Sequence, residues 1–257
     1  MLVHMETNDA DQTGKPLDDV IGAYRRLGVV ALREFFSAPR VAELADESDR
    51  LLEKFRAGEI DPARIAYRPA MGGGQLFERF DPVCDIAPVC ARAASDPRLL
   101  DLAGRLLQEE PVLFKDKLIY KFDGDRGYAL HQDLPYYDVP ESLWDGLATF
   151  AVAIDGVSQA DGGIQFYLGC HGFVQPAPPG QPKDVDPAAV ASADKWDAAV
   201  PPGSLIVFHT LTPHGSGPNR SGRPRRLLYL TYIRKSSSHM REAYYRRRII
   251  EQSGRTP

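Results

Sequence analysis

Three side chains have the types and spacing needed to hold a metal ion. His131 and Asp133 flank Gln132 directly after a strand-like run, and in an extended segment residues i and i+2 point to the same face. An imidazole and a carboxylate would therefore converge on one point. His214, in the run PHGSG (213–217), is the best candidate for a third ligand. Two histidines and one carboxylate leave three octahedral positions open, an arrangement typical of non-haem Fe(II) oxygenases.

Arg225 indicates what else such a site could bind. It opens an apolar run eleven residues after His214, and an arginine in a buried strand costs desolvation energy unless it meets an anion. Its planar fork suits a carboxylate. The keto acid end of 2-oxoglutarate could chelate the iron while its far carboxylate reaches Arg225. The alternative is a surface arginine, because residues 220–248 include ten Lys or Arg and one acid, Glu242.

Other interpretations of these residues stay open. The HxD tripeptide can occur by chance, with a surface aspartate and a hydrogen-bonded core histidine. His209 lies at a predicted strand end five residues before His214 and could compete for the metal. The run GSG at 215–217 is not the GxSxG of a nucleophile elbow, so a serine hydrolase has little support.

Several aromatic and basic side chains are candidate substrate contacts. The aromatic ones could floor a pocket or pack in the core, and the histidine could lie near the pocket mouth or be structural. The basic ones could anchor an anionic substrate or be solvated. These candidates are Tyr136, Tyr137, Trp144, His171, Arg126, Lys115 and Arg79.

The first half of the chain is predicted to be mainly helical. Apolar residues recur at helical spacing over 17–27, a strand follows at 29–32, and Ser37 can cap a helix that reaches about residue 56. The stretch 58–88 is expected to be irregular, and a third helix fits 91–109.

After residue 110 the pattern changes to short β-rich runs separated by Gly, Pro and Asp turns, as in an all-β sandwich. The expected strands are 111–122, 147–154, 163–168, 203–209 and 226–233, followed by a helix over 238–252. Seven prolines fall between Val174 and Gly203, and so long a segment without regular structure is usually a lid or a binding loop.

These elements predict one α+β domain spanning 1–257, mainly β with flanking helices. Residues 1–16 are expected to be flexible, 17–110 to form a helical layer, 111–235 to form the double-sheet β core, and 174–202 to form a lid loop.

Composition excludes several classes of protein. Hydrophobic residues make up 43% and charged residues 26% of the 257, which is typical of a globular protein. The net charge of −4 predicts no nucleic-acid or anionic-membrane partner, and no apolar run approaches the ~20 residues that span a bilayer. No secretory signal begins the chain, and the three cysteines form no CxxC. We therefore expect a cytoplasmic protein, as a monomer or a homodimer.

The motifs resemble those of the phytanoyl-CoA dioxygenase family of Fe(II)/2-oxoglutarate oxygenases. The resemblance rests on the HQD run at 131–133, the PHGSGPNRS run at 213–221, and Arg225. It extends to the segments 117–124, 161–171 and 203–208, and it covers about residues 115–245. The chain departs from the family pattern at three positions, namely Leu168, Cys170 and Ser204, and none of these is a metal ligand.

This resemblance implies a double-stranded β-helix, the cupin-like jelly roll. It implies that His131, Asp133 and His214 bind Fe(II) and are catalytic, and that Arg225 and Ser216 bind the 2-oxoglutarate carboxylate. Some members also use a polar residue in the strand before HxD, for which Tyr120 and Lys117 are the candidates here. With O₂ as the second cosubstrate, the reaction would release succinate and CO₂ and hydroxylate a substrate C–H bond.

The resemblance leaves the substrate and the outcome open. The carboxylate of Asp133 favours hydroxylation over halogenation, whereas desaturation, epimerisation and cyclisation use the same chemistry. The family accepts acyl-CoA esters, amino-acid derivatives, phosphonates and natural-product intermediates, and the polar surroundings of HxD favour a small or medium polar metabolite. A cupin-like isomerase without 2-oxoglutarate, a nucleic-acid demethylase and a non-catalytic binding protein are the alternatives.

Overall fold

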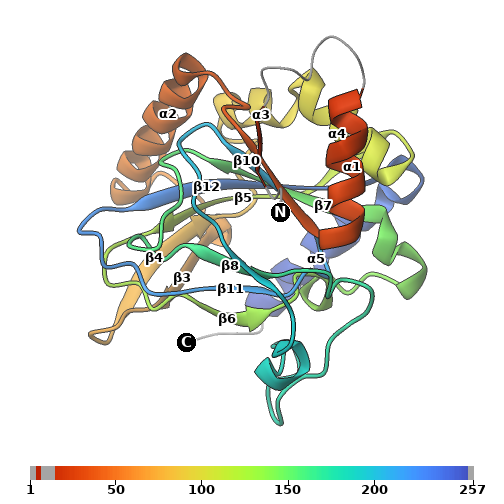
Figure 1. Cartoon of the computed structure of the whole chain (residues 1–257). Coiled ribbons are helices and arrows are strands. Elements are labelled where there is room, and N and C mark those ends of the chain that lie inside the picture. The colour runs from red at the N-terminus through yellow and green to blue at the C-terminus, as the bar shows by residue number, and fades with distance from the viewer. Residues whose placement is uncertain (1–3, 7–14, 254–257) are drawn as a thin grey trace.

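Two β-sheets form the centre of the computed structural model, which describes residues 4–6 and 15–253 (Figure 1). The strands are β1 (His4–Glu6), β2 (Val29–Arg33), β3 (Ile65–Pro69), β4 (Gln75–Phe80), β5 (Pro111–Lys121), β6 (Tyr128–His131), β7 (Leu147–Ala153), β8 (Ile164–Tyr167), β9 (Lys195–Asp197), β10 (Leu205–His209), β11 (His214–Ser216) and β12 (Arg225–Arg234). The larger sheet has the order β1-β2-β10-β7-β12-β5-β4-β3, and the smaller one β6-β11-β8-β9. Neighbouring strands are antiparallel except for the parallel pair β1 and β2.

The central strands of the large sheet are buried on both faces. Every residue of β7 and of β10 is buried, because one face packs against helices and the other faces the small sheet. This explains why their sequences are almost continuously apolar rather than alternating. The double-stranded β-helix with flanking helices that the sequence predicts is confirmed.

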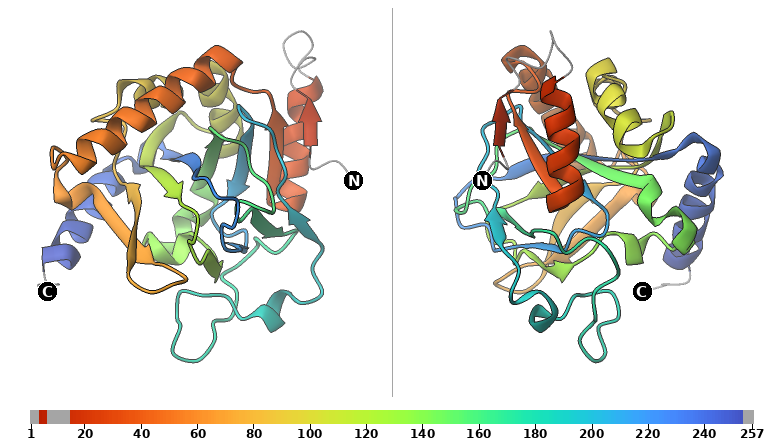
Figure 2. Two further views of the ribbon diagram at one scale, coloured as in Figure 1. Left: turned by 90° about the vertical axis from the view of Figure 1, so that its left-hand side faces the viewer. Right: turned by 45° about the vertical axis from the view of Figure 1, so that its right-hand side comes forward.

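Four helices cover the side of the large sheet that faces away from the small sheet (Figure 2). They are α1 (Lys15–Leu27), α2 (Ala38–Arg56), α3 (Pro88–Ala94) and α4 (Pro97–Leu107). A fifth helix, α5 (His239–Ser253), packs through Tyr244 in a separate cluster with Phe114 of β5 and Ile233 of β12. The helix α5 thereby closes one end of the space between the sheets.

Two details of the N-terminal half differ from the prediction. The stretch 58–88 is not irregular throughout, because β3 and β4 form a hairpin that extends the large sheet at its edge. The predicted third helix is two helices, since Pro97 cannot continue a helix and the Asp96 side chain accepts a hydrogen bond from the Arg98 N–H, which starts α4. Residues 17–110 are therefore not a purely helical layer.

The proline-rich segment 174–202 carries more structure than expected. It contains the 3₁₀ turn η5 (Pro187–Val190) and strand β9, whose Trp196 stacks on Phe166 with ring centroids 5.6 Å apart. The Val185 N–H donates to the Leu130 carbonyl, which fastens this segment to β6. Of the residues 1–16 that were expected to be flexible, 1–3 and 7–14 lie outside the described residues, while 4–6 form β1.

Candidate active site

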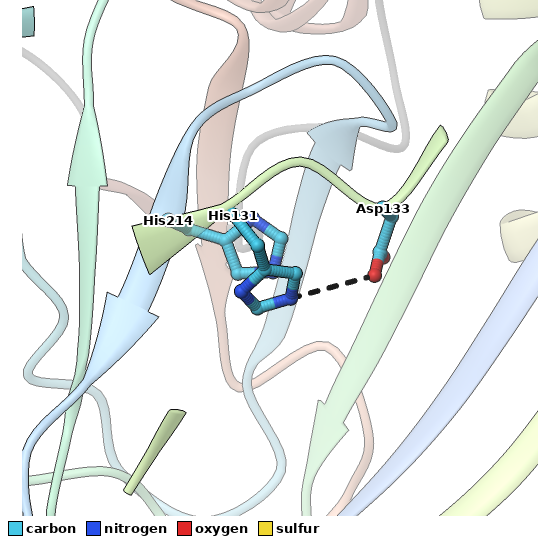
Figure 3. Close-up of side chains that lie close together, drawn as sticks. All are labelled: His131, Asp133 and His214. Carbon is cyan, nitrogen blue, oxygen red and sulfur yellow. Dashed lines mark ion pairs between the residues drawn. The ribbon is translucent and has the colours of Figure 1, made fainter. Parts of the chain in front are cut away.

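The predicted metal ligands come together between the two sheets. His131 ends β6 and His214 begins β11, and the two residues are direct cross-strand partners. Asp133 follows two residues later, at the start of the 3₁₀ turn η3 (Leu134–Tyr136). The ligand atoms of the three residues lie within 4.8 Å of one another, and His131 Nε2 is 3.8 Å from Asp133 Oδ1 (Figure 3). This spacing suits a single metal ion.

Hydrogen bonds orient both imidazole rings. His131 Nδ1 lies 2.8 Å from the carbonyl oxygen of Ala129, and His214 Nδ1 lies 2.9 Å from that of Thr212. A carbonyl oxygen only accepts, so each Nδ1 carries the proton and each Nε2 keeps a free lone pair. Both rings thus present Nε2 as a metal-binding atom.

The electrostatics keep Asp133 and His214 in the forms that bind a metal. Burial alone would raise the pKa of Asp133, but the positive charges of Lys117, His214, His131 and Lys115 outweigh burial and lower the pKa to about 2. Burial, together with the charge of His131, lowers the pKa of His214 to about 4. At neutral pH the carboxylate is therefore ionised and His214 is neutral, as metal binding requires.

Gln132 fixes the loop between the two neighbouring ligands. Its side-chain NH₂ donates to the carbonyls of Phe173 and Leu211, and its amide oxygen accepts from the Gln175 N–H at 2.8 Å. Gln132 is only 1% exposed, so the role of its side chain is structural.

A narrow pocket leads from the triad to Arg225, which is 3% exposed. Arg225 lies on β12 directly opposite Lys121 of β5. Its Nη2 donates to the Gly162 carbonyl at 3.3 Å, and its Nε is 3.7 Å from Asp161 Oδ1. Among the described residues, neither Arg225 Nε nor Asp161 Oδ1 has a hydrogen-bond partner. A buried guanidinium whose Nε has no hydrogen-bond partner is suited to bind an anion, so the pocket between the triad and Arg225 is a candidate site for a dicarboxylate.

Ser216 and Lys121 lie beside Arg225. Lys121 Nζ donates to Ser216 Oγ at 2.8 Å and to the carbonyls of Gly162 and Gly217, and the Tyr128 N–H donates to Ser216 Oγ at 3.2 Å. Burial, and then the charge of Arg225, lowers the pKa of Lys121 to about 7. The Ser216 oxygen therefore accepts two hydrogen bonds, which leaves its own hydrogen free to be donated.

A second, wider cavity of about 790 Å³ opens on the other side of the triad. His131 and Asp133 form part of its wall, together with side chains from β3, β4, β5, the loop after β6, and α5. Basic side chains predominate over acidic ones around it. The basic residues are Arg79, Lys115, Lys117, Lys183, Arg247 and Arg248, and the acidic ones besides Asp133 are Glu78 and Asp184.

Three residues proposed from the sequence lie away from these pockets. Tyr120 points to the helices and its hydroxyl donates to the Ser48 carbonyl at 2.6 Å, because alternation along β5 places it on the face opposite to Lys117. His171 lies against α1, with Nε2 3.2 Å from the Arg25 carbonyl. Arg126 is exposed, and its Nε donates to the Ala70 carbonyl. These positions correct the expectations of cosubstrate and substrate contacts for the three residues.

The remaining candidates divide between the cavity and the core. Tyr136 and Tyr137 line the wide cavity, as do Lys115 and Arg79, whereas Trp144 packs in the core near Tyr244. His209 does not join the triad; its ring lies 5.3 Å from that of His171.

The structure also brings in two residues that the sequence analysis missed. Lys121 is four residues after Lys117 in one strand, so strand alternation alone predicts that it shares the face of the site. Arg248 had no such signal, because nothing in the sequence shows where α5 docks.

A double-stranded β-helix that carries two histidines and a carboxylate between its sheets defines the class of non-haem iron oxygenases. Residues 24–227 match the family model described as phytanoyl-CoA dioxygenase (PhyH), and the chain belongs to this family. It is an Fe(II)/2-oxoglutarate-dependent dioxygenase that uses O₂. The alternatives of a cupin-like isomerase and of a non-catalytic binding protein are therefore set aside.

Relatives and solved structures agree with this assignment. The methylphosphonate hydroxylase of Gimesia maris is 32% identical over 242 residues, covering 89% of this chain and 85% of that protein. The 2-aminoethylphosphonate dioxygenase of an uncultured bacterium (HF130_AEPn_1) is 31% identical over 56% of this chain and 54% of that protein. The crystal structure of EctD from S. alaskensis with 2-oxoglutarate and 5-hydroxyectoine superposes with a TM-score of 0.73 and 25% identity, covering 90% of this chain and 79% of that one. Within the described residues, no helix is long and apolar enough to cross a membrane.

Proposed function

We propose that this dioxygenase hydroxylates a small phosphonate-type substrate, the carbon chain of which lies at the triad while its anionic head lies in the wide cavity. The observation that carries the proposal is the excess of basic side chains around a cavity that shares His131 and Asp133 with the metal site. Two relatives that are 32% and 31% identical bear names that refer to phosphonates, which supports the same substrate class.

In this proposal His131, Asp133 and His214 hold Fe(II), and Arg225 with Ser216 holds the far carboxylate of 2-oxoglutarate. When bound, the iron supplies the oxidation of a substrate C–H bond, coupled to the conversion of 2-oxoglutarate and O₂ into succinate and CO₂. The chain itself orients the two imidazoles through Ala129 and Thr212 and keeps Asp133 ionised. Burial of Asp133 and His214 between the sheets limits the access of water.

A nucleic-acid substrate receives little support from the basic segment 220–248. Arg225 is buried, Arg226 is paired with Asp155 at 2.7 Å and Asp49 at 2.8 Å, and Arg241 is paired with Asp116 at 3.0 Å. These charges serve the fold and the site rather than a binding surface. The three cysteines are unpaired, in keeping with the proposed cytoplasmic location.

Succinate release tests the proposed substrate class. Purified protein with Fe(II), 2-oxoglutarate and O₂ should release succinate faster with methylphosphonate or 2-aminoethylphosphonate than with the matching carboxylates, acetate and β-alanine. ³¹P NMR should show a hydroxylated phosphonate as the product. Equal stimulation by the carboxylates or by ectoine would contradict the proposal.

Lys121 is expected to position the Ser216 hydroxyl for the cosubstrate. In Lys121→Met the serine loses one of its two donors, so its hydrogen is no longer directed to the carboxylate, and we expect the KM for 2-oxoglutarate to rise about tenfold, which corresponds to the loss of roughly one hydrogen bond. The kcat at saturating 2-oxoglutarate should change little. Steady-state kinetics check this, with Lys54→Met on the exposed side of α2 as the control. A KM equal to that of the parent enzyme would show that Lys121 is only structural.

The tip of the proline-rich segment is expected to act as a lid. Residues 176–182 are largely exposed, whereas Lys183 and Asp184, which follow them, line the wide cavity. Replacing 176–182 by a Gly-Ser linker of equal length should raise the ratio of succinate to hydroxylated product at least twofold, because a looser mouth admits water and releases substrate. Iron binding should stay unchanged. If the ratio and the substrate affinity match those of the parent, the segment has no role in closure.

A further inference from the structure

The charged residues at the inner end of the wide cavity surround one carboxylate. Asp81 is fully buried, and its Oδ2 lies 3.3 Å from Arg79 Nε, 3.7 Å from Lys115 Nζ and 2.5 Å from Arg248 Nη1. A single negative charge thus faces three cations that come from β4, β5 and α5.

The charges around this carboxylate do not balance. Among the described residues, Glu78 is the one further acid that forms an ion pair with any of these three cations: it pairs with Arg79 at 2.6 Å and also accepts a hydrogen bond from the Tyr128 hydroxyl. On the positive side, Lys117 projects into the same cavity from the same face of β5. Four cations therefore face two carboxylates, if Asp133 is reserved for the metal, and two positive charges remain uncompensated.

The excess of positive charge acts on the pKa values of Lys115 and Lys117. Burial lowers the pKa of Lys115, and the nearby Arg79 and Arg248 lower it further, against the opposing effect of Asp81. Burial also lowers the pKa of Lys117, with Lys115 and Arg79 contributing in the same direction against Asp133. An arriving anion with two negative charges would compensate both groups.

Arg248 has unused donors at this position. Its side chain is 13% exposed; Nη1 forms an ion pair with Asp81 Oδ2, while Nη2 has no hydrogen-bond partner among the described residues. A guanidinium can form a fork of two hydrogen bonds to the oxygens of a tetrahedral oxoanion. Arg248 also lies beyond residues 24–227, the span that matches the family model.

We infer that Arg248 of α5, with Arg79, Lys115 and Lys117, forms a subsite for the dianionic head group of the substrate, and that Arg248 is a specificity-determining residue. The inference rests on the proposed function and deepens it. The subsite selects a doubly charged phosphonate over a singly charged carboxylate because two positive charges are available.

Kinetics of Arg248→Gln test this inference. The KM for methylphosphonate should rise at least tenfold, while the KM for 2-oxoglutarate and the affinity for Fe(II) stay within about twofold of the parent values. Arg248→Lys keeps the positive charge but loses the fork of two hydrogen bonds, so its KM for methylphosphonate should lie between those of the parent and of Arg248→Gln. Arg246→Gln is the matched control, because Arg246 is on the same helix with a side chain that is 70% exposed and paired with Glu242. Thermal melts of all variants confirm that they are folded.

Inorganic phosphate separates the inference from the proposed function. Calorimetric titration of phosphate into the protein loaded with iron and 2-oxoglutarate should show binding that Arg248→Gln weakens at least tenfold and Arg246→Gln does not. If this holds but no phosphonate is turned over, the subsite stands and the proposed substrate is wrong. If phosphonates are turned over while Arg248→Gln keeps the parent KM and phosphate affinity, the inference is overturned. Absence of phosphate binding to the parent protein would also overturn it.

Discussion

Asp133→Ala should abolish hydroxylation. The substitution removes the anionic ligand of the proposed iron site, and because loss of a mere supporting residue around a metal typically costs 10–100-fold in affinity or activity, we expect iron affinity to fall by more than about 100-fold and turnover to fall below about 1%. The parent protein should bind one Fe(II) per chain. Metal titration followed by iron analysis, together with succinate release, measures both quantities.

The fold should survive this change. The Asp133 side chain does not cap the 3₁₀ turn η3 that follows it, so that turn does not depend on the carboxylate. The neighbouring Gln132 keeps its three hydrogen bonds to the surrounding loops. Far-UV circular dichroism should match that of the parent. Asp145→Ala is a suitable control, because it also removes one negative charge but from a side chain that is 94% exposed. Full iron affinity and turnover in Asp133→Ala would show that the triad is assigned wrongly.

Arg225→Ala should have the next largest effect, and it should act on the cosubstrate rather than on iron. Loss of two charge-assisted hydrogen bonds, each contributing roughly 1.5–3 kcal/mol, predicts a rise of at least about 100-fold in the KM for 2-oxoglutarate. Arg225→Lys keeps the charge but loses the planar fork, so a rise of about tenfold is expected. A titration of 2-oxoglutarate at saturating Fe(II) measures the effect.

Arg223→Ala is the control for this experiment, because Arg223 is exposed two residues before Arg225. Arg226 is not an alternative anchor, since it lies on the opposite face of β12 and binds Asp155 through two nitrogens. Unchanged affinity in Arg225→Ala would place the anchor among the other cations of the site, with Lys121 as the nearest in the strand register.

The parts of the fold that could be predicted are those in which local pattern and burial agree. The strands β7 and β10 are apolar throughout because both of their faces are covered, and the run from 111 to 121 is recognisable as a β-rich run although its burial does not alternate. The hairpin of β3 and β4 was missed because β3 is an edge strand and β4 pairs with β5 through two residues only, so both strands have mixed exposure, and a turn with three glycines joins them. Edge strands bury one face poorly, so their sequences carry a weak signal.

The candidate site also has a part that the sequence predicts and a part that it does not. The predicted metal ligands lie in two short motifs; the pairing of β6 with β11 brings the two histidines together, whereas Asp133 follows β6 in a 3₁₀ turn. The wide cavity depends instead on how β4, β5 and α5 pack, which no local pattern encodes. Lys115 and Arg79 were recognised only as possible anion anchors, and Arg248 was not recognised at all. Tyr120 shows the converse error, because a polar residue near the motif was considered without asking which face of the strand it occupies.

The hydrogen bonds that orient the two imidazoles have an evolutionary consequence. Each Nδ1 donates to the carbonyl of the residue two positions earlier in its own chain segment, Ala129 for His131 and Thr212 for His214. Every amino acid supplies such a carbonyl, so no substitution of a distant side chain can remove these partners. The walls of the wide cavity can therefore accumulate mutations while the ligand orientation is inherited unchanged. A lineage with this architecture can exchange one substrate for another without passing through an ancestor that has lost its iron site.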